Sequence, residues 1–235
     1  MASVKTKEKS KKEAKKHTAL AEIAKGRADL YRFFAGFYLE APTKATIKKI
    51  ADTKFVEDMT VLFGKRATRP LEKFVLEYKP SQFKDIEQEF MDILVVAMQG
   101  KFVTPYESVY LTGLMMQRPL IEVRRLYKKA GARFTPSKAG VYEDYIGCEL
   151  GFMHYLADRE SRAWKDFNQD DALNFLRYQV GFLEDHLTLW VDDFCTRLED
   201  CGSPLFQGLA KTTARFVSLD YNQAAELLES LEDEN

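Results

Sequence analysis

Long hydrophobic runs are missing from this 235-residue sequence: the longest uncharged stretches, Ser108–Gln117 and Cys201–Ala210, have ten residues each. A membrane-spanning helix needs about 20 consecutive, mostly apolar residues, so the sequence predicts no stable insertion into a membrane. The basic N-terminus is not followed by an apolar segment with a small-residue cleavage site, which argues against a secretory signal. We therefore expect a cytoplasmic protein.

Cysteine and histidine are scarce, with three of each. Cys148, Cys195 and Cys201 show no metal-like spacing, and we interpret them as reduced thiols. No Glu-x-x-His pair is present, so a ferritin-like di-metal site lacks its ligands. The sequence also lacks a His-Glu-x-x-His motif, a Gly-Lys-Ser/Thr phosphate loop and a Gly-x-Ser-x-Gly elbow. We expect no catalytic residues, no metal and no cofactor, and hence a protein that is not an enzyme.

Two polar groups could still suggest chemistry. Asp170, Asp171 and Asn174 resemble an acidic magnesium motif, but acidic residues are also typical of the first turn of a helix, where they interact with the helix dipole. His186 lies one helical turn before Trp190, and we interpret it as half-buried against that aromatic ring because no nucleophile accompanies it.

Charge is distributed unevenly. Residues 1–16 carry seven lysines and two glutamates, so the rest of the chain has a net charge of −6 although the whole chain is at −1. We interpret residues 1–18 as a basic, flexible tail, disordered or loosely helical, and residues 19–235 as the folded domain. An acidic body argues against nucleic acid as the main partner, since phosphates require a basic face. It suits a cationic partner.

Apolar residues recur at helical spacing from Leu20 onward, and no stretch has the alternating pattern of a strand. Two long helices are predicted, from Tyr142 to Trp164 and from Asp170 to Glu199. The second has an apolar stripe, which we expect to be buried along its length. That stripe comprises Phe175, Leu176, Val180, Leu183, Leu187, Trp190, Phe194 and Leu198. The predicted fold class is an all-α helical bundle.

Two stretches combine turns, acids and aromatics in an unusual way. Pro105–Tyr110 follows Gly100 and joins a turn to large aromatic residues; a buried turn would explain it as well. Glu143–Met153 places an acidic pair before an otherwise apolar helix, and an acidic first turn followed by a core face is an equally good interpretation.

Both stretches resemble signatures of the TorD/DmsD/NarJ group of redox-enzyme maturation chaperones. Pro105, Ser108, Val109 and Tyr110 match Pro-x-x-Ser-Val-Tyr. The stretch Tyr142–Met153 is similar to Pro-x-Asp-His-(apolar)-Gly-x-Glu-Leu-x-Phe-Met, with Tyr142 replacing the proline and Tyr145 replacing the histidine.

Two further stretches extend this resemblance over roughly residues 25–230. Phe90, Ile93 and Leu94 are similar to an aromatic-x-x-Leu-Phe motif. The sequence from His186 to Phe194 resembles the family's His-Leu-x-x-Trp-x-x-x-Phe helix.

The resemblance implies a TorD-like protein of two helical lobes, about 19–130 and 141–235, joined by a hinge after Pro136–Gly140. It further implies a chaperone that binds the twin-arginine leader and the body of a molybdopterin-dependent oxidoreductase, delays its export and assists cofactor insertion. We expect carboxylates of Glu143 or Asp144 to pair with a leader arginine beside an apolar groove. The predicted leader-binding residues are Phe90, Ile93, Leu94, Pro105, Ser108, Tyr142, Glu143, Asp144 and Tyr145.

The alternative function is a small-molecule-responsive helical regulator. Such a protein would need a basic helix-turn-helix, and the basic tail is followed by no recognition-helix pattern. Either a monomer or a domain-swapped dimer is compatible with a hinged, two-lobed helical chain.

Overall fold

The computed structural model describes residues 2–96, 100, 102–135 and 141–233, with side chains from residue 11 onward. Within these residues it contains helices and no strand; its one β-type contact is an isolated antiparallel bridge between Tyr106 and Tyr145. The predicted all-α fold class is confirmed.

The elements, in chain order, are α1 (Ala2–Leu39), α2 (Lys44–Ile50), α3 (Thr53–Phe63), α4 (Lys65–Glu77), the 3₁₀ turn η1 (Pro80–Gln82), α5 (Phe83–Phe90), the π turn η2 (Met91–Val95), α6 (Glu107–Thr112), α7 (Arg118–Lys129), α8 (Ile146–Lys165), α9 (Gln169–Phe182), the π turn η3 (Leu183–Leu187), α10 (Thr188–Glu199) and α11 (Pro204–Asp233). None of these helices has a stretch long and apolar enough to cross a membrane.

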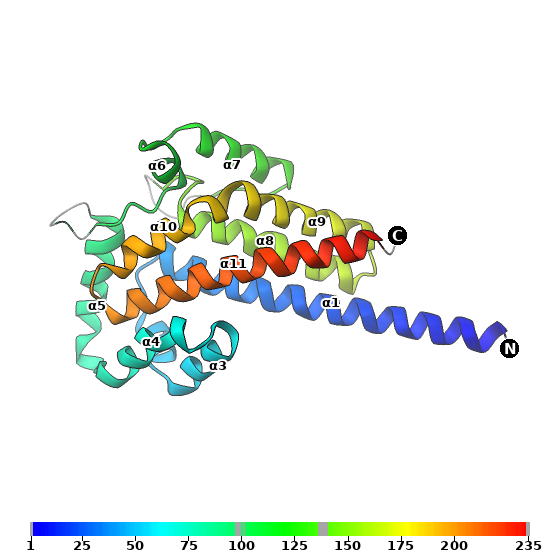
Figure 1. Cartoon of the computed structure of the whole chain (residues 1–235), viewed down its shortest axis with the longest axis horizontal. Coiled ribbons are helices and arrows are strands. Elements are labelled where there is room, and N and C mark those ends of the chain that lie inside the picture. Colours follow the sequence, from blue (N-terminus) through cyan, green and yellow to red (C-terminus); the bar gives the residue numbers. More distant parts are fainter. Residues whose placement is uncertain (1, 97–99, 101, 136–140, 234–235) are drawn as a thin grey trace.

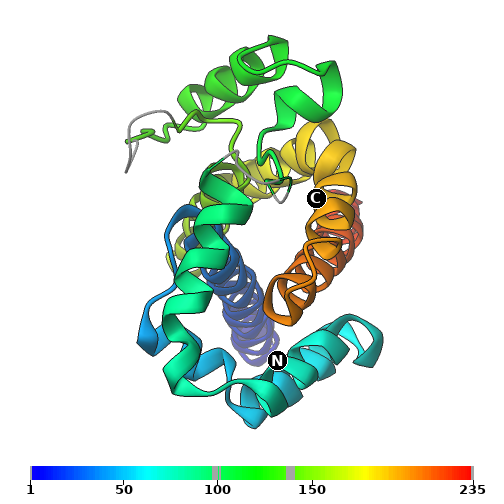
Figure 2. The ribbon, with the colours of Figure 1, turned by 90° about the vertical axis from the view of Figure 1, so that its left-hand side faces the viewer.

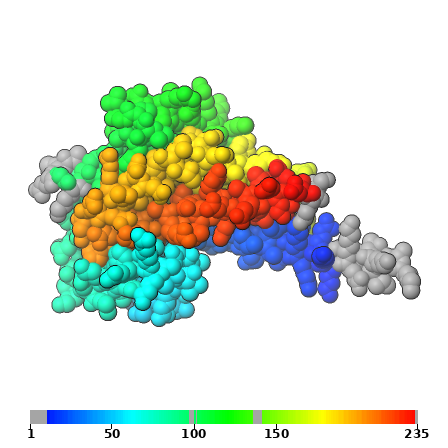
Figure 3. Space-filling view, in the orientation of Figure 1, coloured from blue at the N-terminus to red at the C-terminus, as the bar shows by residue number. Residues whose placement is uncertain are grey.

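The long helices α1, α8, α9, α10 and α11 run along the long axis of the molecule, with α3 and α4 on one side and α6 and α7 on the other (Figure 1). Helix α1 packs along α8, and α11 packs against α10 and α4. The view down this axis shows the helices arranged around a common centre (Figure 2). Helices α9, α10 and α11 cover one broad face (Figure 3).

Several helix ends follow local rules that the sequence makes visible. The side chain of Asp52 accepts a hydrogen bond from the Lys54 N–H at 2.8 Å and caps α3. Helix α7 has Pro119 in its first turn, where proline is favoured, and ends before Gly131. Gly131 has a φ of +74°, a left-handed conformation that favours glycine.

Two glycines allow helices to approach closely. A Cβ on Gly147 of α8 would lie 2.6 Å from Cγ of Leu39 in α1, and a Cβ on Gly208 of α11 would lie 2.5 Å from Cγ of Leu71 in α4. Neither distance leaves room for a side chain. These contacts fix how α1 meets α8 and how α11 meets α4.

The two expected lobes share one hydrophobic core. Phe34 of α1 stacks on Phe216 of α11 with ring centroids 5.6 Å apart, and Tyr31 contacts the same ring at 4.6 Å. The ranges 19–130 and 141–235 are therefore packed together along α1. The predicted hinge at 136–140 lies outside the described residues.

A buried ionic network joins four helices, and the sequence pattern did not indicate it. Arg27 of α1 donates to Asp220 of α11 at 2.5 Å and to Glu160 of α8 at 3.1 Å. The hydroxyl of Tyr31 donates to Asp220 at 2.5 Å, and Gln179 of α9 donates to Glu160 at 2.8 Å. The carboxylates compensate the buried guanidinium and hold the bundle in register.

The basic segment that we expected to be a flexible tail forms the first turns of α1, which begins at Ala2. In Figure 1 this end of α1 reaches beyond the other helices. Among the residues whose side chains are described, His17 is the first buried one, and it lies edge-on to Trp164 with ring centroids 5.1 Å apart. The folded body thus starts inside the range 1–18.

The two long helices predicted near the C-terminal half differ in detail from the prediction. Helix α8 starts at Ile146, four residues later than expected, because Tyr145 has extended backbone angles of −78° and 136°. The helix predicted from Asp170 to Glu199 is interrupted by the π turn η3. Of the eight stripe residues expected to be buried, Phe175 and Val180 are half-buried, and the other six are buried: Leu176, Leu183, Leu187, Trp190, Phe194 and Leu198.

Candidate functional site

The stretches singled out in the sequence meet at one place. The N–H of Glu107 donates to the carbonyl of Asp144, and the N–H of Ile146 donates to the carbonyl of Pro105, both at 2.9 Å. These two bonds flank the bridge between Tyr106 and Tyr145. The turn before α6 and the turn before α8 are therefore one backbone unit.

The third predicted stretch is attached to the same unit. The N–H of Val103 donates to the carbonyl of Ile93 at 2.8 Å, which places η2 beside the segment that leads to Pro105. The side chains of Phe90, Ile93 and Leu94 are at most 3% exposed. Pro105 and Ser108 are also buried. In this structure these five residues lie in the core and present no side chain to a ligand.

Asp144 corrects one expectation of the sequence analysis. Its side chain is 1% exposed, and its Oδ2 accepts hydrogen bonds from the N–H of Ser108 at 3.2 Å and from the Ser108 hydroxyl. The carboxylate therefore fixes the start of α6 onto the turn before α8. It does not face solvent, where a client arginine would approach.

We expect Asp144→Ala to lower the free energy of unfolding by about 1–3 kcal/mol, because two buried donors lose their acceptor. Urea unfolding followed by circular dichroism measures the change. Ser108→Ala should show a non-additive effect with Asp144→Ala, since the two side chains share one hydrogen bond. Additive losses would mean that Asp144 acts through another partner.

Tyr145 occupies the position at which the resembled signature has a histidine. Its hydroxyl donates to the carbonyl of Tyr38 at 2.6 Å, and the side chain is 6% exposed. Burial raises the pKa of Tyr145 well above its usual range, so the hydroxyl remains a donor. The phenol thus ties the start of α8 to the end of α1, a distance that a shorter imidazole would not span in the same way.

A buried acidic cluster lies where the starts of α6 and α8 meet, a place that we call the junction. Nδ1 of His186 is 2.9 Å from Oε1 of Glu107, and Nε1 of Trp190 donates to Glu149 at 3.1 Å. Burial, and then the neighbouring Glu107, raises the pKa of Glu149 well above its usual range, which favours its neutral form. All four side chains are at most 3% exposed. They hold η3 and α10 against α6 and α8 and have no access to a substrate.

Part of the sequence interpretation of His186 is thereby revised. The ring is nearly fully buried, stacks on Phe182 at 4.9 Å and has the Glu107 carboxylate as partner. In the described part of the chain, no three His, Cys, Asp or Glu side chains are grouped so that they could hold a metal ion.

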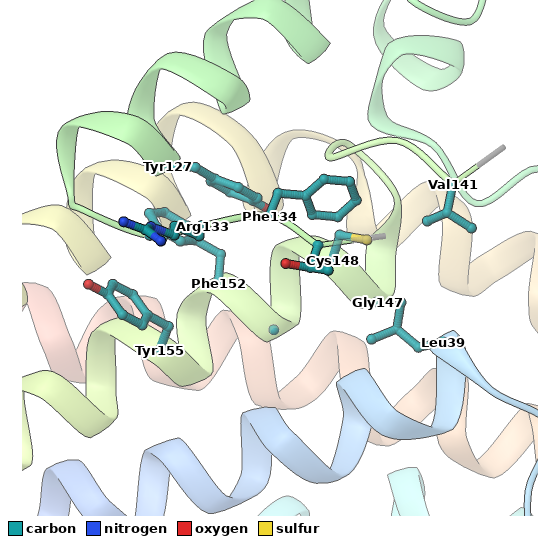
Figure 4. Close-up of a pocket in the computed structure, with 12 residues that line it drawn as sticks. Leu39, Tyr127, Arg133, Phe134, Val141, Gly147, Cys148, Phe152 and Tyr155 are labelled. Carbon is teal, nitrogen blue, oxygen red and sulfur yellow. The ribbon is translucent and has the colours of Figure 1, made fainter. Parts of the chain in front are cut away.

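An open cavity of about 250 Å³ adjoins the junction, between the end of α1, the C-terminal end of α7 and the first turns of α8. Figure 4 shows aromatic rings along its walls. The lining residues are Leu39, Tyr127, Ala132, Arg133, Phe134, Thr135, Val141, Gly147, Cys148, Gly151, Phe152 and Tyr155. We call this cavity the junction pocket.

The walls of the junction pocket are mostly apolar and pre-formed. The rings of Tyr127 and Phe152 are 4.2 Å apart, and Phe152 lies 6.4 Å from Tyr155 in a stacked arrangement. Gly151 also lines the pocket, and a Cβ added to it would meet no atom of another part of the chain within 4 Å. Burial raises the pKa of Cys148 well above its usual range, so it contributes a neutral thiol.

One predicted carboxylate reaches the surface beside this pocket. The hydroxyl of Tyr127 donates to the backbone carbonyl of Glu143 at 3.1 Å, which fixes Glu143 at the pocket's flank. The Glu143 side chain is 14% exposed and forms an ion pair with Arg124 of α7 at 2.8 Å. Tyr142 beside it is half-buried and contacts the ring of Tyr106 at 6.2 Å.

Most of the residues that form the pocket could not be recognised from the sequence. Tyr127 and Phe152 belong to the apolar faces of α7 and α8, where a cavity wall and a core position show the same pattern. Phe134 offered the better signal, because it is a large aromatic residue in a connection between helices.

Two comparisons with known proteins match the part of the chain that contains these features. The family model described as nitrate reductase delta subunit matches residues 64–196, more than half of the chain. A perchlorate reductase assembly chaperone protein from Dechloromonas aromatica (strain RCB) is 27% identical over 109 residues. That alignment covers 46% of this chain and 47% of the relative, so the similarity spans about half the length of each protein.

The range matched by the family model includes all nine residues that the sequence analysis assigned to a binding site, together with the acidic cluster and every residue of the junction pocket except Leu39. The chain belongs to the nitrate reductase delta subunit family, the TorD/NarJ type of redox-enzyme maturation chaperones.

Proposed function

We propose that this protein is a cytoplasmic assembly chaperone for a molybdopterin-dependent oxidoreductase. It holds the enzyme's twin-arginine leader at the junction pocket, delays export and keeps the enzyme available for cofactor insertion. The observation that carries the proposal is a pre-formed apolar pocket with a surface carboxylate, Glu143, at its flank. Family membership and the perchlorate reductase assembly chaperone support the type of client.

The chemistry of such a leader fits this combination. Two adjacent arginines precede an apolar segment, so the ligand has a cationic part and a hydrophobic part. A side chain of leucine or phenylalanine size that enters the junction pocket would contribute about 1.5–3 kcal/mol through burial. A guanidinium at Glu143 would add a charge-assisted hydrogen bond. The proposal involves no catalytic step.

Capture from the native host provides the direct test. The tagged full-length protein, purified from host cells and analysed by mass spectrometry, should retain a molybdenum-dependent oxidoreductase subunit that carries a leader. Recovery of a different class of protein, with no such subunit, would contradict the proposal.

Filling the pocket should weaken leader binding. Gly151→Met extends a side chain into the junction pocket, where an added Cβ meets no atom within 4 Å. We expect at least about tenfold weaker binding of a fluorescent peptide with two adjacent arginines followed by leucines and alanines, because one buried side chain loses its place. Fluorescence anisotropy measures the dissociation constant.

Gly181→Met is the matched control for this variant. Gly181 lies inside α9, away from the pocket lining, and an added Cβ there also meets no atom within 4 Å. Both substitutions improve helix propensity to a similar degree. Equal affinities of the two variants would remove the junction pocket from the binding site.

A further inference from the structure

The surface carboxylate at the junction pocket is already paired with an arginine of the same chain. Oε1 of Glu143 is 2.8 Å from Nε of Arg124, and the two side chains are 14% and 48% exposed. Arg124 lies on α7, one turn before Tyr127, so the pair stands directly beside the pocket wall. A client guanidinium could reach Glu143 only if Arg124 moved away.

The pairing leaves one carboxylate oxygen unsatisfied. Oε2 of Glu143 is buried and has no hydrogen-bond partner among the residues that the structure describes. A buried acceptor without a partner costs free energy, whereas a guanidinium that binds both oxygens in the bidentate manner satisfies each of them. Nε of Arg124 approaches Oε1 of Glu143, and this contact leaves Oε2 without a partner in the described part of the chain.

Arg124 can also leave at low cost. Its side chain is about half exposed, and its one ion pair in the described part of the chain is with Glu143. Solvent screens the exposed arginine side of the pair, which lowers the cost of releasing Arg124. Once released, the guanidinium would be hydrated at the surface of α7.

We propose that Arg124 is an internal substitute for a client arginine: it occupies Glu143 in the free chaperone and is displaced when a leader binds. This inference rests on the proposed function and adds a determinant of affinity and specificity to it. The substitute keeps a partly buried carboxylate paired in the absence of a client. It also lowers the affinity for any ligand, because the free energy that a ligand gains at Glu143 is reduced by the free energy of the Glu143–Arg124 pair that it replaces.

Removing the substitute should therefore tighten leader binding. We expect Arg124→Gln to bind the two-arginine peptide about twofold to fivefold more tightly than the wild-type protein, since the lost pair no longer has to be broken. Glutamine is a good helix former, so α7 should be unaffected. Anisotropy titrations with the full-length protein at one fixed salt concentration measure the change.

Three controls separate the exchange of Arg124 for a leader arginine at Glu143 from a general effect of removing a positive charge. Arg125→Gln removes the same charge from the next residue, which forms no ion pair with Glu143 in the structure as described, and should leave the affinity nearly unchanged. Glu143→Gln should weaken binding, and combining it with Arg124→Gln should produce no further change in affinity. A peptide with glutamines in place of both arginines should bind the wild-type and the Arg124→Gln protein equally.

The outcomes distinguish this inference from the function on which it rests. If wild-type protein binds the peptide and Arg124→Gln binds it no more tightly than Arg125→Gln, the exchange is refuted while leader binding stands. Weaker binding by Arg124→Gln would make Arg124 a direct contact and also refutes the exchange. If neither wild-type nor variant protein binds the peptide, leader recognition itself fails, and the exchange fails with it.

Discussion

Asp220→Ala is expected to lower the free energy of unfolding by about 3–5 kcal/mol, because it leaves the charge of Arg27 buried without its main partner. Arg27 and Asp220 have side chains that are 9% and 2% exposed, and two hydrogen bonds, of 2.5 and 3.0 Å, join them. The same change removes the acceptor of the Tyr31 hydroxyl. Glu160, at 3.1 Å from Arg27, compensates only part of this loss.

Urea unfolding of the wild-type and variant proteins measures this effect. Asp29→Ala is the matched control, because Asp29 lies on the same helix, is 43% exposed and forms ion pairs with the exposed side chains of Lys25 and Arg32. That change should cost less than about 1 kcal/mol. Similar losses for Asp220→Ala and Asp29→Ala would show that the Arg27 network contributes no more than a surface pair.

Trp190→Ala should also destabilise the protein by about 3–5 kcal/mol, through the cavity that it leaves. The indole is 1% exposed and packs against Tyr110 and Phe194, with ring centroids 5.3 and 5.7 Å away. Its Nε1 is also the donor to Glu149, whose buried carboxyl group would lose that partner. Both effects act in the same direction.

Leu189→Ala tests the specificity of this effect at the adjacent position. Leu189 of α10 is 53% exposed, so its truncation should change the free energy of unfolding by about 0.5 kcal/mol or less. A change of that small size for Trp190→Ala would instead mean that the predicted stripe is not a packed face.

Helical periodicity predicted the fold class and the buried stripe of α9 and α10, because burial follows the 3.6-residue repeat. It did not predict the π turn at Leu183–Leu187. That turn adds a residue to the helical ladder where His186 meets Glu107, a residue 79 positions earlier in the chain. A contact over that separation leaves no trace in local periodicity.

The structure brings together the stretches around Ile93, Pro105 and Asp144 from which the site was predicted, but the sequence did not indicate which of their side chains are accessible. Asp144 and Glu143 are neighbours in the sequence, yet one is buried against Ser108 and the other reaches the surface. Their difference depends on the backbone unit that Pro105 and Ile146 form. Sequence alone could not assign the two roles, because both residues have the same chemistry.

The division into two lobes was drawn from the resemblance and from chain order. The structure adds that α1 packs along α8, so the first and later parts of the chain share a core. The Gly147–Leu39 and Arg27–Asp220 contacts hold this arrangement. Neither pair could be recognised from spacing, since each joins residues more than a hundred positions apart.

The Arg27–Asp220 pair has a consequence for how the chain acquires its structure. These residues are 193 positions apart, and Ser161 donates to the carbonyl of Ala21 across 140 positions. During synthesis, α1 leaves the ribosome before α8 and α11 exist, so its apolar face stays uncovered until α8 has been made. Contacts of such long range slow folding, since a large loop must close before they form. Helix α1 therefore reaches its native environment in two stages, because α8 can cover its apolar face first and Arg27 gains its partner Asp220 only when α11 is complete.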